Sequence, residues 1–418
     1  MRYLKIKNIG PIVEIDIELS KLNIFIGPQS SGKSTITKIA CFCSWVEKKV
    51  ALLNYNQELF SVSGTFAENL VRFHKLTGYL RNDSYIYYES DILQIEYNHS
   101  EKIPVFKWKN RFEYKKGKIS YIPSERNIVG AIPNWINIKF IDNNIRSFMS
   151  DWEEARNTHR KESPLDILNI GAKYFFDGDE DKVIINQSNE ELELTNTSSG
   201  LQSLIPLLVI IDYIYDWIYY NENPESVKDI KDNNAINADL IQEVFGAAEY
   251  TEIRKAMEKG ISVSVSEDDI DDFLENLDRL ELLKENFKEV HYTNVYLEEP
   301  EQNLFPEAQR DLVSELICFN NLHEDHTLTM TTHSPYILSS INNLMYASQV
   351  GRKDSQRVNS IVSEQNWMCY DKVRAYFVDK GTAYSILDDE VKQIKAEVID
   401  EVSNILNKEY EGLLEIDN

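Results

Sequence analysis

The chain has 418 residues, enough for one large domain or two to three ordinary ones, and its 42% hydrophobic content can form a substantial core. The formal net charge of -25 argues against a surface coated for general binding to nucleic acid or anionic membranes, although it leaves room for a local basic patch. Four cysteines are too few and too scattered for a disulfide framework, so we expect reduced thiols in a cytoplasmic protein.

The N-terminal segment alternates polar and apolar residues as a strand does, and it lacks the long apolar core of a signal peptide. Residues 3–26 predict strands around a turn at residues 8–11, and the last of these strands is the apolar run 22–26. Residues 35–53 predict a helix. The segment between this strand and this helix is therefore a short strand-to-helix loop.

That loop, residues 27–35, matches the P-loop pattern of Gly, four free positions and Gly-Lys-Ser. Glycines there let backbone N–H groups point at phosphates, and the helix N-terminus adds its partial positive charge. We expect Lys33 to reach the β- and γ-phosphates of ATP and Ser34 to ligate Mg²⁺; a structural Gly/Ser turn is the alternative. The predicted nucleotide-binding residues are Gly27, Pro28, Gln29, Ser30, Ser31, Gly32, Lys33, Ser34 and Thr35.

Residues 54–80 mix helix and loop signals, whereas residues 85–121 are rich in β-forming residues. Within the β-rich part, six cations are interleaved with Trp108, Phe112 and Tyr114. Such a stretch could contact nucleic-acid phosphates and stack on bases, but a solvated β-hairpin is the simpler explanation, and we favour it. The six cations are Lys107, Lys109, Arg111, Lys115, Lys116 and Lys118.

The longest apolar stretch runs from Leu204 to Tyr220. It is short for a membrane span, and Asp212 and Asp216 interrupt it, so we expect a buried helix. Strands interleaved with helices return over residues 290–350, and together with the P-loop they predict an α/β fold.

Two carboxylates and a proline follow the apolar strand that begins at Val295. This is a Walker B arrangement, in which one carboxylate at the strand end holds the Mg²⁺ shell and the next orients and deprotonates the attacking water. We assign Glu298 to the metal and Glu299 to the water. An ordinary charged turn is the alternative.

Two further segments complete the pattern. A β-branched strand over residues 329–332 delivers His333 to a turn, where it resembles the switch histidine that contacts the γ-phosphate in ABC-type ATPases. Residues 196–203 resemble an ABC signature motif, because Ser199 and Gly200 stand at the start of the apolar helix and can grip a γ-phosphate by the helix dipole. Taken alone, the histidine could be structural and the Ser-Ser-Gly sequence could be an ordinary loop.

In this order, the P-loop, signature, Walker B and histidine make the chain resemble the ABC-type ATPases of the SMC/RecF/OLD branch. It is more closely similar to the stand-alone AAA-15/AAA-21 type ATPases of bacteria, whose Asp-Glu-Pro-Glu-x-x-Leu-His-Pro and Tyr-Ile-Pro-Ala-Glu-Arg segments resemble residues 298–306 and 121–126. The resemblance covers about 1–46, 119–126, 195–220 and 290–340. It implies a P-loop NTPase of the ABC-head type, with a β-rich lobe and helical insertions.

In this family two heads close over two ATPs, so the resemblance implies a homodimer with composite sites. Lys33, Glu299 and His333 would be catalytic, and Ser34 and Glu298 would hold Mg²⁺, all within one subunit. The signature residues of the other subunit that would bind the nucleotide are Ser199, Gly200 and Gln202. Asn303, after Walker B, would cross the interface.

The expected organisation has six parts. They are an N-terminal ATPase lobe (1–126), a small helical lobe (127–197), the signature and its helix (198–220), an acidic helical insertion (221–290), a C-terminal ATPase lobe (291–387) and an acidic C-terminal helix (388–418).

The chain departs from the family pattern in three places. Glu298 replaces the usual Asp, and its extra methylene would push metal contact through water and slow turnover. Phe305 replaces the usual His. No Q-loop glutamine is visible, and Glu125 or Arg126 are the candidates for that position.

The resemblance suggests a function by analogy. ATPases of this kind often stand beside a separately encoded effector in anti-phage systems such as PARIS, Septu and retron-linked ATPases. We therefore expect an ATP-dependent switch that senses a trigger and controls an effector nuclease or toxin, with no nuclease of its own and no membrane partner. The alternative is a DNA-repair or DNA-maintenance ATPase like RecF that uses residues 107–118 to bind DNA.

Overall fold

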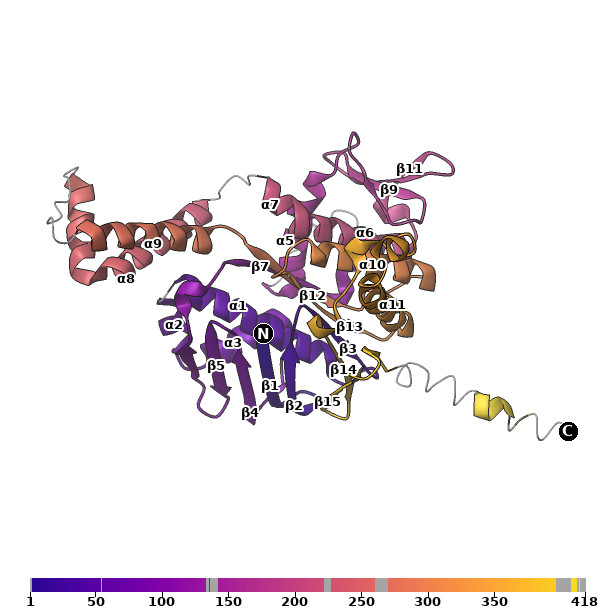
Figure 1. Cartoon of the computed structure of the whole chain (residues 1–418), viewed down its shortest axis with the longest axis horizontal. Coiled ribbons are helices and arrows are strands. Elements are labelled where there is room, and N and C mark those ends of the chain that lie inside the picture. The colour runs from indigo at the N-terminus through magenta and orange to yellow at the C-terminus, as the bar shows by residue number, and fades with distance from the viewer. Residues whose placement is uncertain are drawn as a thin grey trace.

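The computed structural model describes residues 2–53, 55–132, 135, 142–221, 227–259, 270–395, 407–411 and 413. A six-stranded sheet with the order β15-β14-β3-β13-β12-β7 forms its centre (Figure 1). Every neighbouring pair in it is parallel except β14 and β15. The strands are β3 (Leu22–Ile26), β7 (Gly117–Ile122), β12 (Tyr292–Glu298), β13 (Thr327–Thr332), β14 (Val373–Asp379) and β15 (Thr382–Ser385).

A second, antiparallel sheet with the order β2-β1-β4-β5-β6 forms the predicted β-rich lobe. The predicted turn after the first strand is present, and Asn8 and Gly10 both have a φ of 53°, a value that glycine and asparagine accept most easily. The strands are β1 (Arg2–Ile9), β2 (Ile12–Leu19), β4 (Leu80–Glu89), β5 (Leu93–Asn98) and β6 (Pro104–Trp108).

Helix α1 (Lys33–Leu52) lies between the two sheets (Figure 1). One hydrophobic core joins α1 to the antiparallel sheet and to Phe25 of β3, and a second core joins the other face of the central sheet to the helices beyond it. Successive residues of β3 point to opposite faces, so Ile24 belongs to the second core and Phe25 to the first. Both faces of the parallel sheet are therefore covered, as such sheets require.

Helices α6, α10 and α11 cover that second face. Their bounds, with those of the short helices elsewhere, are α2 (Tyr55–Phe60), α3 (Thr65–His74), α4 (Ile128–Ala131), α5 (Asn144–Ala155), α6 (Ser199–Asp212), α7 (Ile218–Tyr220), α10 (Pro306–Asn321), α11 (Pro335–Gly351) and α12 (Ser355–Asn359). The strand–helix–strand alternation predicted for residues 290–350 is confirmed, and so is the α/β fold class.

The lobe expected to be mostly helical contains a sheet as well. After α5, a four-stranded antiparallel sheet has the order β11-β10-β9-β8, so the helical prediction fails for this part. These strands are short and many of their residues are charged. The alternation of polar and apolar residues that predicts a strand is therefore not apparent in the sequence. The strands are β8 (Leu165–Asp166), β9 (Ala172–Phe176), β10 (Asp181–Ile185) and β11 (Glu190–Glu193).

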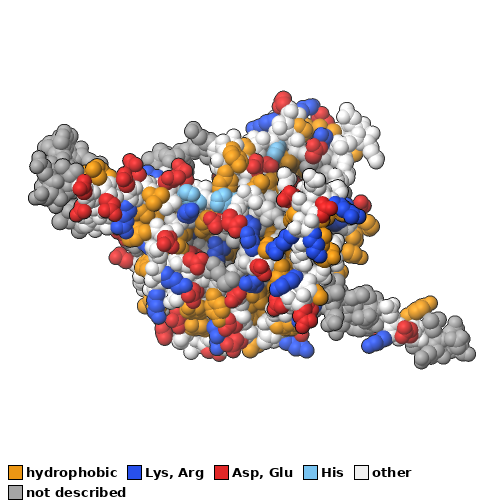
Figure 2. All heavy atoms as spheres, in the orientation of Figure 1, with side chains coloured by type: hydrophobic (Ala, Val, Ile, Leu, Met, Phe, Trp, Pro, Cys, Tyr) orange, Lys and Arg blue, Asp and Glu red, His pale blue; other side chains and the backbone are white. Residues whose placement is uncertain are grey.

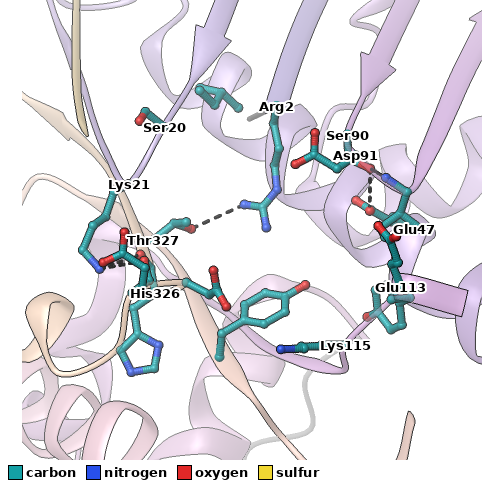
Figure 3. Close-up of a pocket in the computed structure, with 16 residues that line it drawn as sticks. Arg2, Ser20, Lys21, Glu47, Ser90, Asp91, Glu113, Lys115, His326 and Thr327 are labelled. Carbon is teal, nitrogen blue, oxygen red and sulfur yellow. Dashed lines mark hydrogen bonds between the residues drawn. The ribbon is translucent and has the colours of Figure 1, made fainter. Parts of the chain in front are cut away.

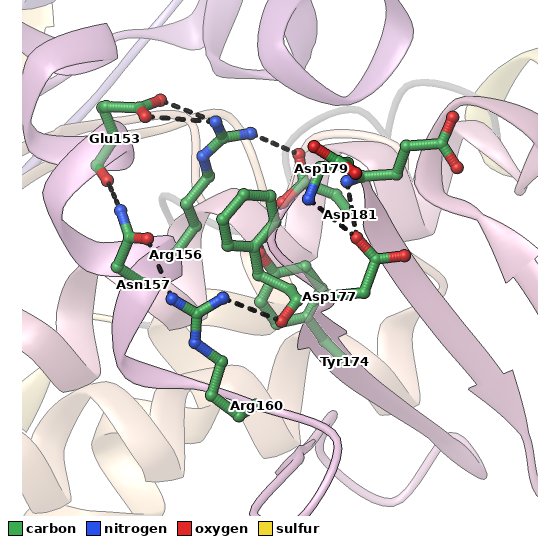
Figure 4. A network of polar contacts seen from close by, with 10 residues as sticks. Glu153, Arg156, Asn157, Arg160, Tyr174, Asp177, Asp179 and Asp181 are labelled. Carbon is green, nitrogen blue, oxygen red and sulfur yellow. Dashed lines mark hydrogen bonds and ion pairs between the residues drawn. The ribbon is translucent and has the colours of Figure 1, made fainter.

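A polar network ties α5 to this sheet (Figure 4). The Arg156 guanidinium lies 2.9 Å from Glu153 and 3.2 Å from Asp181, whose other carboxylate oxygen accepts from the Tyr174 hydroxyl at 2.6 Å. Burial is the main cause of a raised pKa at Asp181. The network therefore holds this sheet against α5. The last strand of the sheet, β11, leads directly to the signature segment.

The apolar stretch 204–220 is a core helix, as predicted. The continuous helical segment Ser199–Tyr220 comprises α6, a π-helical turn at Tyr213–Trp217 and α7, and 67% of its most apolar window is buried inside the protein. By length and composition alone this segment could cross a membrane. Its burial against the central sheet accounts for its apolar composition.

Helices α8 (Val227–Lys259) and α9 (Ile270–Lys288) form an arm that extends from the body (Figure 1). Acidic side chains gather along it (Figure 2), and Asp271, Asp272 and Glu275 of α9 are exposed, as predicted for the acidic insertion. Asp268 and Asp269, which belong to the same predicted acidic insertion (221–290), lie outside the described residues. Gly246 has a φ of 82° and marks a kink within α8.

The basic stretch 107–118 attaches this arm to the body. Arg111 is buried, donates from Nε to the Ala51 carbonyl at 2.9 Å, and pairs with Asp239 and Glu243 of α8. Three further cations of the stretch hold partners within the chain: Lys109 pairs with Glu89, Lys116 donates to the Lys288 carbonyl, and Lys118 pairs with Asp151. Trp108, Phe112 and Tyr114 pack in the apolar core of the arm. The stretch is thus neither a free hairpin nor a continuous cationic surface.

The predicted helix from residue 388 is wrong for its first part. Residues 387–394 form a small hairpin of β16 (Leu387–Asp388) and β17 (Gln393–Ile394). The Asp388 side chain accepts from the backbone N–H groups of Glu390 and Val391, which is an Asx turn, and Asp389 accepts from the Tyr370 hydroxyl. Carboxylates that favour solvated helix starts can equally stabilise turns, and here the turn prevails.

Candidate nucleotide-binding site

The P-loop connects β3 to α1, as predicted, and its glycines are sterically required. A Cβ at Gly27 would lie 2.1 Å from the Val378 carbonyl oxygen of neighbouring β14. Gly32, the N-cap of α1, has a φ of 112°. A residue with a side chain would be strained in this backbone conformation. The backbone can therefore approach β14 and turn sharply into α1 only with these two glycines.

The Lys33 ammonium group lies inside the loop and donates to the carbonyl oxygens of Gly27 and Pro28, both at 2.8 Å. Burial lowers its pKa to about 8, against the opposing effect of the Glu299 and Glu301 carboxylates. The Ser31 hydroxyl is buried and forms no hydrogen bond within the described part of the chain. A partly desolvated cation in a loop of backbone N–H groups is suited to bind phosphate.

Glu298 ends β12 and is 4% exposed. Its Oε2 accepts from the Ser124 N–H at 3.2 Å, while Oε1 is buried and has no hydrogen-bond partner among the described residues. A buried carboxylate oxygen without a donor fits a cation, and Ser34 at the start of α1 offers a hydroxyl of the kind that ligates Mg²⁺ in a P-loop. These two residues therefore suit the predicted magnesium ion.

Glu299 and His333 lie side by side. The Nε2 atom of His333 is 3.6 Å from Oε1 of Glu299, and both side chains are about a third exposed. Glu299 has a φ of 44°, and its N–H donates to the Thr331 carbonyl of β13 at 3.0 Å. The His333 N–H donates to Glu301 at 2.6 Å. The predicted water-activating carboxylate is thus fixed at the backbone while its side chain faces a histidine.

Three neighbouring strands bring these groups together. The P-loop follows β3, His333 follows β13, and Glu298 and Glu299 stand at the end of β12, in a sheet where β3, β13 and β12 are adjacent and parallel. The carboxyl ends of parallel strands meet at one edge, where ligands of α/β proteins usually bind. The predicted residues from these three segments thus share one edge of the sheet.

Arg126 has a role that the sequence did not reveal. It was a candidate for lining the site, but it is 1% exposed and lies beneath the Walker B turn. Its guanidinium donates to the carbonyl oxygens of Glu298 at 2.8 Å, Glu299 at 2.7 Å and, through Nε, Ser203 of α6 at 3.2 Å. Burial lowers its pKa to about 10. Arg126 therefore joins the Walker B turn to the signature helix.

The signature segment begins α6, as predicted. Ser198 is the N-cap and accepts from the Leu201 N–H, and Ser199 is exposed. The Gln202 amide nitrogen donates to the carbonyl oxygens of Thr195 and Thr197, so in this conformation it holds the loop before the helix. In the described part of the chain, no hydrogen bond joins Ser199 or Gly200 to the P-loop. The hydrogen bonds of this segment are therefore local, within the loop before α6 and its first turn.

Asn303, expected to cross a subunit interface, contacts the signature helix of its own chain. Its side chain donates to the Ser203 hydroxyl at 3.2 Å, and its carbonyl oxygen lies so close to Gly200 that a Cβ there would be 3.0 Å away. Gly200 therefore allows the segment after Walker B to lie against α6.

A cavity of about 480 Å³ lies at the opposite edge of the sheet, where β3, β12 and β13 begin (Figure 3). The Arg2 guanidinium extends into it and donates to the Asn294 side chain at 3.2 Å, and Glu47 and Lys21 stand on its walls. Both acidic and basic side chains line it. This cavity is not part of the P-loop site.

No protein-family model and no curated protein matches the chain. Among solved structures, it is similar to the SMC head domain from Thermotoga maritima (10% identity, 92% of this chain and 98% of that one, TM-score 0.37) and to the recombination mediator protein RecF (10% identity, 92% and 97%, TM-score 0.32). It is also similar to the ATP-binding cassette of an ABC transporter (12% identity, 97% and 98%, TM-score 0.29). Function must therefore be argued from the residues of this chain.

Affinity for MgATP should fall as the pH rises above 8. Phosphate binding favours the charged form of Lys33, whose pKa in the free protein is about 8, so deprotonation in the free state opposes binding. Between pH 7 and pH 9 we expect the Kd, measured by titration calorimetry, to rise about tenfold. In the Lys33→Arg variant the guanidinium stays charged, and the dependence should flatten. A wild-type Kd that is constant over this range would contradict the assignment.

Replacing Arg126 should destabilise the protein. Arg126→Lys keeps a charge but cannot reach all the carbonyl oxygens, which leaves buried acceptors without donors at about 1–3 kcal/mol each. We expect the free energy of unfolding in urea to fall by about 2–4 kcal/mol. Arg352→Lys, at an exposed position, is the matched control and should change it little. Equal stability of the two variants would show that Arg126 does not stabilise the Walker B turn.

Proposed function

We propose that the chain is an ATPase that binds ATP with Mg²⁺ at the P-loop. One observation carries the proposal: Lys33, Glu298, Glu299 and His333 stand at the same end of three adjacent parallel strands. A phosphate-binding loop alone fits many nucleotide-binding proteins. A loop combined with a buried metal-binding carboxylate and a second carboxylate beside a histidine fits hydrolysis.

The residues divide the work. Backbone N–H groups of residues 27–35 and the Lys33 ammonium bind and orient the phosphates. Ser34 and Glu298 would hold Mg²⁺, which neutralises phosphate charge when bound. Glu299 takes the proton of the attacking water, and His333, 3.6 Å from it, can orient the carboxylate and contact the γ-phosphate.

We further propose that the active unit is a homodimer with composite sites. Ser199 is exposed at the start of α6, where the helix dipole favours an anion, and among the described residues no hydrogen bond joins it to the P-loop of the same chain. A second copy that contributes Ser199 and Gly200 would place a helix N-terminus opposite the γ-phosphate. Asn303, against Gly200, would then lie near the junction.

At the level of biology, we propose a cytoplasmic, ATP-controlled switch in anti-phage defence that holds or releases a separate effector. The acidic arm of α8 and α9 supports this role, because an exposed carboxylate-rich surface favours a basic protein partner. The alternative, a DNA-maintenance ATPase, needed the cations of residues 107–118. Arg111, Lys109, Lys116 and Lys118 hold internal partners, so we favour the switch.

Removing the proposed base should separate binding from hydrolysis. Glu299→Gln retains the size and hydrogen-bonding capacity of the side chain but cannot take a proton, so turnover should fall about 10²-fold or more while ATP still binds. Phosphate release and nucleotide binding are the two measurements. Glu307→Gln, exposed in the first turn of α10, is the matched control. If Glu299→Gln hydrolyses ATP at the parental rate, the assignment of Glu299 as the Walker B base is wrong.

If the sites are composite, two inactive variants with defects in different halves of the site should complement each other in a mixed dimer. A Lys33→Ala subunit loses phosphate binding but keeps its signature, and a Ser199→Arg subunit has the reverse defect. In a mixed dimer one site has both intact halves, so mixing two inactive variants should restore part of the hydrolysis measured for the parent. Activity of an isolated monomer at the parental rate per subunit would contradict the shared-site proposal.

The effector role predicts no cleavage by the chain alone. Purified protein should leave DNA and RNA intact with Mg²⁺ or Mn²⁺, whereas cells that carry the chain with its neighbouring genes should resist phage, and Lys33→Ala should abolish that resistance. Gel assays and plating efficiency are the measurements. Cleavage by the purified chain that disappears in a variant with Asp388→Ala and Asp389→Ala would replace the switch with a self-contained nuclease.

A further inference from the structure

A second large cavity, of about 540 Å³, lies outside the P-loop site. Four elements wall it: α1 after its first two turns, α3, the strand β7 and α5. Its volume is within the range of small-molecule sites in proteins. None of the residues assigned above to ATP or Mg²⁺ lines it.

The cavity is positively charged, although the chain as a whole carries -25. Two carboxylates line it, Asp142 and Asp151, and both pair with cations of the same wall: Asp151 with Lys118 at 2.8 Å, and Asp142 with Arg72 at 3.8 Å. Five cations line it, three more than the carboxylates. They are Lys48, Lys49, Arg72, Lys118 and Arg146.

Lys48 is the cation of this wall that is surrounded by other lysines. Burial, together with the neighbouring Lys116, Lys118 and Lys49, lowers the pKa of its ammonium group to about 7. Its Nζ donates to the Gly117 carbonyl at 2.6 Å, which uses one of three donors. An anion in the cavity would relieve the repulsion and accept the remaining hydrogen bonds.

The rest of the wall is aromatic and polar. Trp45 and Phe73 are half-buried in it, and Lys49 lies over the Trp45 ring at 5.9 Å. His74 is fully buried, and neither of its ring nitrogens has a hydrogen-bond partner among the described residues. Its neutral imidazole therefore retains one donor and one acceptor. Aromatic rings beside a group that can both donate and accept suit a flat heterocycle better than a bare anion.

We propose that this cavity binds a nucleoside phosphate at a site separate from the P-loop, with the phosphate among Lys48, Lys49 and Arg72 and the base toward the aromatic wall. The proposal does not depend on ATP hydrolysis. A ligand there would touch α1, whose first residue is Lys33, and β7, which leads to Arg126. Occupancy would thus stabilise the arrangement of the two elements that position the catalytic residues.

The test uses the full chain with Lys33→Ala, so that the P-loop contributes little to binding. Titration calorimetry with AMP, GMP, CMP and UMP should show one site per chain for at least one of them. Inorganic pyrophosphate is the probe without a base, and it should bind at least tenfold more weakly. The double substitution Lys49→Glu with Arg72→Glu, in the same background, should raise the Kd of the bound nucleotide tenfold or more.

Two further variants in the same background complete the experiment. Lys107→Glu with Lys353→Glu makes the same charge change at exposed positions outside the cavity and should leave the Kd unchanged. Ser147→Trp fills the cavity from α5 without altering its charge and should abolish binding, with circular dichroism as the check on folding. Absence of binding by all four nucleotides, equal binding of pyrophosphate, or a Kd that both charge reversals change equally would overturn the proposal.

Discussion

The buried guanidinium group of Arg126 is the interaction on which the proposed catalytic geometry depends. It binds backbone carbonyl oxygens of the Walker B turn and of the signature helix at the same time. Removing an arginine from water is costly, and carbonyl oxygens at 2.7–3.2 Å with the nearby Glu298, Glu299 and Glu301 carboxylates offset that cost. Because its lowered pKa is still about 10, the group is charged at neutral pH. The turn and the helix therefore form one unit.

The central sheet supplies the other half of this geometry. Parallel pairing of β3, β13 and β12 places the P-loop, His333 and the two carboxylates along one edge of the sheet. Short loops after the three strands are therefore enough to bring these groups together. The close approach of Gly27 to β14 fixes the loop from the side. Strand pairing and one buried arginine thus determine the positions of the groups proposed to bind phosphate and to activate water.

Much of this could be predicted from the sequence, because the P-loop, the strand before it and the carboxylates after β12 are local patterns. What could not be predicted depends on contacts between distant segments. Arg126 resembles any arginine after a strand until its acceptors, Ser203 and Glu298, come beside it. The sheet β8–β11 has strands of two to five residues, too short for alternation to show. Asp388 accepts a backbone hydrogen bond that stabilises a turn. An aspartate at the start of a helix accepts the same kind of bond, so the sequence pattern does not distinguish the two structures.

The basic stretch 107–118 shows why charge along a sequence does not determine its partner. Arg111 is buried against carboxylates of α8, and the aromatic residues beside it form the core that holds the arm. These cations thus neutralise part of an acidic insertion that would otherwise repel the acidic body. The cavity between α1 and α5 differs from this stretch, because the fold brings its cations together from α1, α3, β7 and α5. The proposed second ligand site thus rests on charge that the fold assembles from several elements, and not on the charge of one segment.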